Sequence, residues 1–252
     1  MEVFGLDIGG SGIKGAPVDT ATGELLSERI RIKTPQPSTP EAIVRTSVEV
    51  IRKAGWSGPV GCGFPAVVKD GILRTAANVD ESNIGFDLKS ALGEALGEEV
   101  HLVNDADAAG MAEIKWGAAR EEYGTVLMVT LGTGLGTALF TGGHLVANTE
   151  LGHIEIRGED AEHRASDTAR KRENLRWKAY GQRLDEYLNR IDALLWPDLI
   201  VLGGGISKKS EKFMDQLSVR ARVVIAEMHN EAGIAGAALA SVSEAERTGE
   251  LA

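Results

Sequence analysis

Short apolar or alternating runs, bounded by glycines and other turn residues, predict β-strands along most of the chain. These runs cover Glu2–Ile8, Ile13–Val18, Glu24–Lys33, Pro59–Gly63, Val100–Val103, Thr125–Thr130, Thr137–Thr141, Leu199–Leu202 and Val223–Ala226. Longer segments with helical periodicity lie between them, at residues 40–54, 87–96, 106–116, 166–195 and 232–247. Strands and helices that alternate in this way predict an α/β protein.

The pattern of a strand, a glycine turn and a second strand occurs twice, at residues 2–18 and again at 125–141. The Gly142-Gly143 pair after the second unit is a hairpin signal. We therefore expect a duplicated fold with two similar lobes, an N-terminal lobe over residues 1–105 and a C-terminal lobe over 106–230. The last helix, about 231–252, is expected to pack back on the first lobe.

Composition narrows the classes of function. The 252 residues carry a net charge of −10, which disfavours nucleic acid and anionic membranes as partners. No apolar run is long enough to span a bilayer, and the start of the chain resembles a strand rather than a leader peptide. The single cysteine, Cys62, excludes an intrachain disulfide and a cysteine-rich zinc site. These features predict a cytoplasmic protein.

The first glycine turn contains the spacing G-x-G-x-x-G at residues 10, 12 and 15. A dinucleotide site requires a helix directly after this turn, whereas here a strand continues and contains Pro17, and the P-loop spacing also fails. The turn is therefore either a plain hairpin or a loop whose backbone N–H groups bind phosphate. In the second case Asp7 could orient Mg²⁺ through water. The candidate donor-binding residues are Asp7, Gly9, Gly10, Ser11, Gly12 and Lys14.

Two further glycine turns follow predicted strands, and each could be a tight turn or a phosphate site. The turn at Gly132-Thr133-Gly134 repeats the combination of glycine and hydroxyl. The turn at Gly203-Gly204-Gly205 ends a buried strand, in a place suited to an anion. Because the first glycine turn, at residues 9–15, and the turn at 132–137 occupy matching positions of the two lobes, these two predict a pair of phosphate loops.

Polar residues at two other places are candidates for a site. Asp105 follows a strand and opens a helix, so that Asp105 or its neighbour Asn104 could be an ordinary N-cap. Alternatively, Asp105 could accept a proton from a substrate hydroxyl in phosphoryl transfer. Glu150 and His153 flank a glycine and could bind vicinal hydroxyls, although a lone histidine is more often structural.

Taken together and in this order, the motifs resemble the ROK family of the actin–hexokinase–Hsp70 superfamily. The resemblance covers essentially the whole chain and is carried by LDIGGSGIKG at 6–15, VNDADAAG at 103–110, LGTGLGT at 131–137, ELGH at 150–153, VLGGGIS at 201–207 and EAGIAGAA at 231–238. It implies an actin-like (ribonuclease H-like) duplicated fold, a sugar kinase with Asp105 as the base, Mg²⁺ as cofactor and a homodimer. It also implies sugar ligands at Asn78, Asn104, Asp105, Glu150 and His153.

One departure from the family pattern concerns the donor. The family follows ELGH with a cysteine-rich zinc motif that contains a further sugar-binding glutamate, but this chain has no cysteine there, so no zinc is expected. Glu162 is the predicted last glutamate, with Glu159 and Glu173 as rivals. The cysteine-free basic stretch from Arg164 to Arg183, the start of the chain and its short length resemble the polyphosphate glucokinase branch of the family. Lys208, Lys209 and Lys212 form a second small basic cluster.

The resemblance to that branch implies phosphorylation of the 6-hydroxyl of glucose by inorganic polyphosphate, with ATP as a further donor. Mannose as acceptor is left open. The alternatives are a strictly ATP-dependent hexose or N-acetylamino-sugar kinase of the same family, and a non-enzymatic sugar sensor. The sensor is disfavoured because the chain begins directly with the first glycine-turn strand and carries no DNA-binding module ahead of it.

Overall fold

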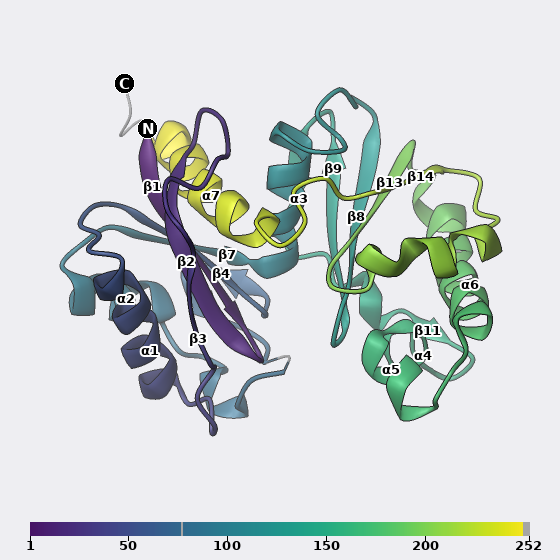
Figure 1. Ribbon diagram of the computed structural model, residues 1–252, viewed down its shortest axis with the longest axis horizontal. Coiled ribbons are helices and arrows are strands. Elements are labelled where there is room, and N and C mark those ends of the chain that lie inside the picture. Colours follow the sequence, from purple (N-terminus) through teal and green to yellow (C-terminus); the bar gives the residue numbers. More distant parts are fainter. Residues whose placement is uncertain (77, 249–252) are drawn as a thin grey trace. The chain divides into compact units, whose positions relative to one another are not determined.

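The structure is a computed structural model that describes the backbone of residues 1–76 and 78–248, with side chains as far as residue 242. The chain forms two compact units (Figure 1). Unit 1 consists of Met1–Ala112 and the segment that starts at Glu231, and unit 2 is Glu113–Asn230. The lobe boundary predicted at residue 105 stays a prediction. Residues 249–252 of the predicted last segment lie outside the described residues.

Unit 1 is built on a five-stranded sheet with the order β3-β2-β1-β4-β7. The strands are β1 (Glu2–Gly9), β2 (Gly12–Asp19), β3 (Ile30–Ile32), β4 (Val60–Phe64) and β7 (Val100–Asn104). Strands β1 and β2 form an antiparallel hairpin, while β4 and β7 run parallel to β1. The carboxyl ends of β1, β4 and β7 therefore meet at one edge of the sheet.

Helices α1 (Pro40–Lys53), α2 (Leu88–Leu96), α3 (Asp105–Lys115) and α7 (Ala232–Thr248) complete this part of the fold. Helix α1 begins at Pro40 as predicted, and the hydroxyl of Thr39 caps it by accepting from the Ala42 N–H. Helix α7 packs closely on β1, β4 and α3, because a Cβ atom at Gly5, Gly61 or Gly236 would overlap the facing backbone. Short elements in unit 1 are β5 (Val68–Lys69), β6 (Ile72–Leu73) and the 3₁₀ turn η1 (Glu81–Asn83).

Unit 2 repeats the arrangement of unit 1. Its five-stranded sheet has the order β10-β9-β8-β13-β14, with an antiparallel β8–β9 hairpin and with β13 and β14 parallel to β8. These strands are β8 (Thr125–Leu131), β9 (Leu135–Thr141), β10 (His144–Val146), β13 (Leu199–Gly203) and β14 (Arg222–Ile225). The predicted Gly142-Gly143 hairpin joins β9 to β10, and both glycines have positive φ. The duplicated fold predicted from the two strand–turn–strand units is thus confirmed.

The remaining elements of unit 2 are short except for one helix. They are η2 (Leu151–His153), β11 (Glu155–Ile156), β12 (Glu159–Asp160), α4 (Glu162–Ala165), α5 (Asp167–Arg172), α6 (Trp177–Leu195), η3 (Ser207–Lys212) and η4 (Met214–Gln216). The predicted single helix over 166–195 is wrong, because the chain leaves helical geometry after Arg172 and Asn174 has a positive φ. The predicted helix after Gly205 is likewise replaced by the 3₁₀ turns η3 and η4.

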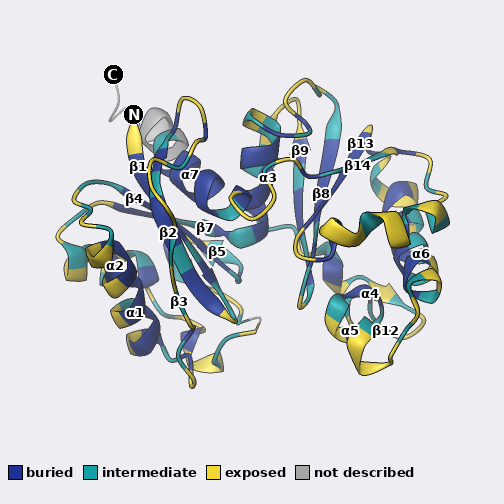
Figure 2. Ribbon diagram, viewed as in Figure 1, coloured by how far each residue is buried: buried dark blue, intermediate teal, exposed yellow. Residues whose placement is uncertain are grey.

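The strand predicted over Glu24–Lys33 is also too long, since only Ile30–Ile32 pairs as a strand and Leu25 forms an isolated bridge with Val18. Each sheet packs against its own hydrophobic core, and buried residues lie along both sheets (Figure 2). Phe4, Phe64 and Ile43 are fully buried in unit 1, and Tyr180 and Phe213 in unit 2. Among the described residues, no helix has the length and apolar character that crossing a membrane requires.

Candidate active site

The first glycine turn joins β1 to β2 and is enclosed by neighbouring chain. A Cβ atom at Gly10 would lie 2.8 Å from the carbonyl oxygen of Asn78, and one at Gly12 would lie 2.7 Å from the Arg31 guanidinium. Arg31 donates through Nη2 to the Ser11 carbonyl at 3.1 Å. Glycine is therefore needed at residue 10, where the facing atom is backbone, whereas a side chain at residue 12 would displace the Arg31 guanidinium. The turn brings together the predicted donor residues, the predicted sugar ligand Asn78, and Arg31.

Asp7 and Lys14 face each other across the β1–β2 hairpin. The Lys14 ammonium lies 2.9 Å from the Asp7 carboxylate, and both side chains are largely buried. Arg31 is the register partner of Lys14 on β3, which places a second cation on the neighbouring strand. A Cβ atom at Gly233, at the start of α7, would overlap the Asp7 carboxylate, so glycine there leaves room for this acid. Two cations and one carboxylate thus lie on β1, β2 and β3, the strands next to the first glycine turn.

Hydrogen bonds show which role Asn104 has at the start of α3. The Asn104 side-chain oxygen accepts from the N–H groups of Ala106 (2.9 Å) and Asp107 (3.1 Å), so Asn104 is the residue that caps α3. Its Nδ2 donates to the Ala66 carbonyl at 3.0 Å, which leaves its second amide hydrogen for a ligand. Asp105 is the half-buried first residue of α3.

In unit 2 the two other glycine turns lie side by side. Strands β8 and β13 run parallel, and their turns follow directly at the carboxyl ends. The N–H of Ile206 donates to the Leu131 carbonyl at 3.2 Å. Gly204 has a φ of 79°, and a Cβ atom there would lie 2.5 Å from the same carbonyl. The predicted donor residues Gly132, Thr133, Gly134, Gly203 and Gly204 therefore belong to one glycine-rich edge.

The ELGH segment lies against β9 in the same unit. The Thr137 hydroxyl accepts from the Leu151 N–H at 3.1 Å, and a Cβ atom at Gly152 would overlap the Leu135 carbonyl oxygen. Nε2 of His153 lies 3.9 Å from the Glu150 carboxylate. Its Nδ1 lies 2.8 Å from the Asp160 carboxylate, which raises the pKa of His153 together with the negative charge of Glu162.

Glu162 lies close to Glu150 and His153, because its negative charge affects the pKa of both, and it also accepts a hydrogen bond from the backbone. Its Oε2 accepts from the Leu135 N–H at 3.3 Å, so the carboxylate lies at the glycine turn between β8 and β9. Burial raises the pKa of Glu150; the nearby His153 lowers it and the negative charge of Glu162 raises it further. Glu150, His153 and Glu162 are thus close enough to influence one another's charge, as ligands of one hydroxylated substrate would need to be.

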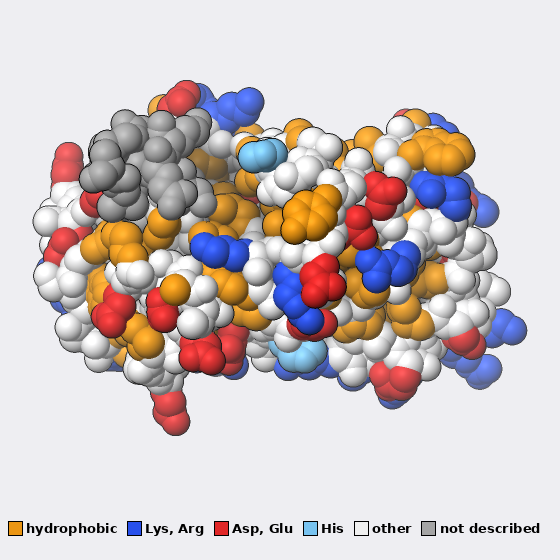
Figure 3. Space-filling model, turned by 90° about the horizontal axis from the view of Figure 1, so that it is seen from above, with side chains coloured by type: hydrophobic (Ala, Val, Ile, Leu, Met, Phe, Trp, Pro, Cys, Tyr) orange, Lys and Arg blue, Asp and Glu red, His pale blue; other side chains and the backbone are white. Residues whose placement is uncertain are grey.

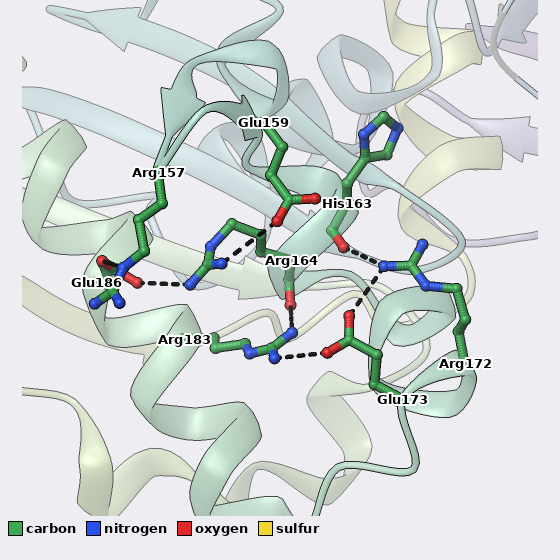
Figure 4. Close-up of polar contacts among 8 residues, drawn as sticks. All are labelled: Arg157, Glu159, His163, Arg164, Arg172, Glu173, Arg183 and Glu186. Carbon is green, nitrogen blue, oxygen red and sulfur yellow. Dashed lines mark hydrogen bonds and ion pairs between the residues drawn. The ribbon is translucent and has the colours of Figure 1, made fainter.

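The rival glutamates are engaged elsewhere (Figure 4). Glu159 pairs with Arg164 at 3.4 Å. Glu173 accepts from Arg183 at 2.6 Å and from Arg172 at 3.0 Å, and these hydrogen bonds lower the pKa of Glu173 to about 2. Both rivals therefore serve as partners of arginines in a surface network, which favours Glu162 among the three candidates.

Most cations of the basic stretch take part in ion pairs of this kind. Arg164 also pairs with Glu186, and Arg170 and Lys171 both pair with Asp167. On the face drawn in Figure 3, basic and acidic side chains likewise lie beside one another. The stretch from Arg164 to Arg183 is therefore largely neutralised. Within the described part of the chain, Arg176, Lys178, Lys208, Lys209 and Lys212 have no ion pair.

Several residues were missed by sequence reasoning. Arg31 comes from a strand whose pairing partner is distant in the chain, and Asp160 comes from the small β11–β12 hairpin. Gly233 lies in a motif that the sequence marked, but without a role. Among the described residues, no three His, Cys, Asp or Glu side chains group closely enough to hold a metal ion, and the absence of zinc stays a prediction.

Comparison with known proteins places these features in a family. A model of the ROK family matches residues 3–169. The polyphosphate glucokinase of Mycobacterium tuberculosis (strain CDC 1551 / Oshkosh) is 46% identical over 242 residues, which are 96% of this chain and 91% of that protein. The inorganic polyphosphate/ATP-glucomannokinase of Arthrobacter sp. strain KM has a TM-score of 0.94 and 44% identity, covering 96% of this chain and 99% of that one.

A more distant structure shows the fold alone. The ROK family glucokinase of Streptomyces griseus, solved with glucose and AMPPNP, has a TM-score of 0.82 at 23% identity and covers 96% of this chain and 100% of that one. With the repeated sheet order of the two units, these likenesses confirm the predicted actin-like α/β fold.

Proposed function

The chain belongs to the ROK family, and we propose that it is a polyphosphate-dependent glucokinase that phosphorylates the 6-hydroxyl of glucose. The observation that carries this proposal is the likeness, over 96% of the chain, to a polyphosphate glucokinase and to a polyphosphate/ATP-glucomannokinase. ATP is proposed as a second donor and mannose as a second acceptor, because the second of these relatives bears both in its name.

Asp105 is proposed as the general base. In the reaction its carboxylate takes the proton of the 6-hydroxyl, the sugar oxygen forms a bond to the terminal phosphorus, and the bridging P–O bond breaks. The shortened polyphosphate, or ADP, leaves with the electron pair. Two features support this role. The N-terminal turn of α3 stabilises a negative charge at residue 105, and the capping function is already performed by Asn104.

The sugar is proposed to bind to Asn78, Asn104, Glu150, His153 and Glu162. The remaining amide hydrogen of Asn104 and the amide of Asn78 would donate to sugar oxygens. The carboxylates of Glu150 and Glu162 would accept from sugar hydroxyls. His153 has its Nδ1 held by Asp160, so that its Nε2 side is oriented toward Glu150. Such fixed donors and acceptors discriminate between sugars that differ in one hydroxyl.

The glycine turns are proposed to bind the donor phosphates. Lys14, supported by Arg31 on the next strand, would neutralise charge on the transferred group. Asp7 fits an indirect role toward Mg²⁺, because this ion keeps most of its waters and needs only one or two carboxylates beside the substrate phosphates. When bound, Mg²⁺ would neutralise the charge that develops on the phosphate oxygens.

A donor assay tests the proposal. Purified protein is incubated with glucose and Mg²⁺ together with polyphosphate, ATP or neither, and glucose 6-phosphate is measured. We expect product with polyphosphate and a smaller or comparable rate with ATP. Product with ATP alone would replace the proposal by a strictly ATP-dependent hexose or N-acetylamino-sugar kinase, and a panel of sugars would then identify the acceptor. No product with either donor would refute kinase activity.

We further propose a homodimer, which a groove on unit 1 supports. The groove has a volume of about 790 Å³ and lies between α1 and the α2 region, where it is lined by Val44, Val48, Phe86, Ala91 and Ala95. Along its rim, α1 carries Glu41, Arg45, Glu49 and Lys53 in alternating charge. In an antiparallel two-fold pairing of α1 with a second copy, Glu41 would face Lys53 and Arg45 would face Glu49.

Light scattering on the eluted protein tests the dimer. Arg45→Glu places like charges opposite each other and should dissociate the dimer, whereas the exchange Arg45→Glu with Glu49→Arg restores the opposite charges and should restore it. A monomeric wild type would refute the proposal that this surface forms a dimer.

A cytoplasmic location is also proposed, because the chain has a single cysteine, Cys62, and its thiol is buried. Cell fractionation tests this location.

A further inference from the structure

Three cations surround one tryptophan in unit 2. The Arg170 guanidinium lies 4.4 Å from the centre of the Trp177 ring, and the ammonium groups of Lys212 and Lys209 lie at 5.6 Å and 5.7 Å. The ring is fixed from behind, where it stacks on Phe213 and meets the edge of Tyr180, both of which are fully buried. Trp177 therefore holds three positive groups in place through cation–π attraction.

Arg170 pairs with Asp167 at 3.0 Å, so only the two lysines of this cluster differ in charge state from the surrounding basic stretch. Arg164, Lys171, Arg172 and Arg183 all have carboxylate partners. Within the described residues Lys209 and Lys212 have none, although Glu211 lies between them in the chain. Like charges held side by side repel one another, and the chain as a whole carries a net charge of −10. An anion bound here would relieve that repulsion.

The cluster is connected to both donor turns of unit 2. Segment η3, which carries Lys209 and Lys212, follows directly after the Gly203–Gly205 turn, and the Ser207 hydroxyl donates to the Gly204 carbonyl at 2.8 Å. Helix α5, which carries Arg170, begins where the Asp167 N–H donates to the Gly132 carbonyl at 2.9 Å. The three cations thus lie on segments that are joined directly to the donor turns.

We propose that Arg170, Lys209 and Lys212, held around Trp177, form an outer subsite for the polyphosphate chain beyond the reacting phosphate. This inference rests on the proposed function, since it assumes that the donor turns bind polyphosphate. Every internal phosphate of such a chain carries negative charge, so the subsite increases the affinity for long chains. ATP has only three phosphates and ends in an uncharged nucleoside, so it gains little from the same cations.

The test compares donors in the variant Lys209→Ala/Lys212→Ala. We expect the KM for long-chain polyphosphate to rise roughly two- to thirty-fold, because the binding free energies of two exposed charge contacts are lost together. The KM for ATP should change less than about twofold, because ATP gains little from these two lysines. The rise should shrink as the polyphosphate is shortened, and salt should weaken long-chain binding less in the variant than in the wild type. Lys209→Arg/Lys212→Arg keeps the charge and should retain the wild-type KM.

The control is Lys69→Ala/Arg190→Ala, which removes the same charge at two exposed positions away from the donor turns and the α1 groove and should leave the KM for both donors unchanged. If the wild type uses polyphosphate and the Lys209/Lys212 variant keeps its KM and its chain-length dependence, the subsite is refuted while the proposed function stands. If the wild type phosphorylates glucose with ATP only, the polyphosphate donor and the subsite both fail. Direct titration of both proteins with polyphosphate separates a binding defect from a loss of turnover.

Discussion

His153 and Asp160 form a close pair, with 2.8 Å between the Nδ1 of the histidine and the carboxylate of the aspartate. The segment between the two residues contains the small β11–β12 hairpin: His153 is the last residue of η2, and Asp160 is the last residue of β12. The contact holds the imidazole in one orientation and favours its protonated form, which raises the pKa of His153. A predicted sugar ligand is thereby oriented by a residue that the sequence did not mark.

Asp160→Asn should therefore lower the pKa of His153. Because the folded-state pKa of this histidine lies above its ordinary value of 6.5, the stabilisation is fully present below that value and is lost as the pH rises through the raised pKa. The gap in unfolding free energy between wild type and Asp160→Asn should thus be larger at pH 6 than at pH 9. Titration of the His153 ring by NMR measures the shift. Glu155→Gln removes an equal charge nearby and serves as control, and an unchanged His153 pKa in Asp160→Asn would contradict the assignment.

Asp105→Asn should reduce kcat with either donor by roughly 10²–10⁴-fold, because the amide cannot accept the proton of the sugar hydroxyl. Asparagine has nearly the same shape as aspartate, so glucose binding measured by calorimetry should persist within a few fold. The two readouts separate loss of the base from loss of the fold. Turnover within tenfold of the wild type would show that another group takes the proton.

Asn104→Ala should destabilise unit 1 by about 1–3 kcal/mol, since it removes the cap of α3 and the buried hydrogen bond to Ala66. Asn104→Asp is the matched comparison, because its carboxylate still caps the helix while the donor to Ala66 is lost. Urea unfolding should therefore rank the wild type above Asn104→Asp and Asn104→Asp above Asn104→Ala. Equal stability of Asn104→Ala and the wild type would refute the capping role.

The sequence predicted those parts of the molecule that are coded locally. The strand–turn–strand units at residues 2–18 and 125–141 were found because glycines interrupt short apolar runs, and the structure forms hairpins at both. The strand periodicity after Ile13 also correctly excluded the helix of a dinucleotide-binding turn. Local context left the cap ambiguous between Asn104 and Asp105, because either residue type suits that position and only the hydrogen-bond geometry distinguishes them.

The parts that the sequence missed depend on pairing between distant segments. Arg31 reaches the first glycine turn only because β3 pairs with β2, and no local pattern contains that register. The basic residues looked like one kind of patch, yet most cations of the stretch from Arg164 to Arg183 are neutralised by carboxylates, whereas Lys209 and Lys212 beside Trp177 have no ion pair among the described residues. That division follows from where Glu159, Glu173 and Glu186 fold back on the arginines, which a linear pattern does not reveal.

Gly152→Ala should weaken glucose binding and stability together. A Cβ atom at residue 152 would overlap the carbonyl oxygen of Leu135, so the segment that carries Glu150 and His153 must move away from β9. We expect the KM for glucose to rise by roughly tenfold or more, and the unfolding free energy to fall by about 1–3 kcal/mol. Gly93→Ala in α2 is the control, because a Cβ atom there makes ordinary contact at 3.4 Å and alanine suits a helix. A normal KM for Gly152→Ala would show that ELGH does not bind the sugar.

Glu173→Gln should destabilise the protein in a pH-dependent way. Arg183 and Arg172 hold the pKa of Glu173 near 2, below its ordinary 4.5, so the stabilisation is present above pH 4.5 and is lost as the pH falls toward 2. Because the Glu173 side chain is 35% exposed, solvent screening limits the effect to about 1 kcal/mol. Urea unfolding of wild type and variant from pH 7 to pH 3 should show a gap that shrinks below about pH 4.5. Glu211→Gln, an exposed carboxylate without an ion pair among the described residues, should show no such gap. A gap for Glu173→Gln that stays constant down to pH 3 would contradict the role of the two arginines.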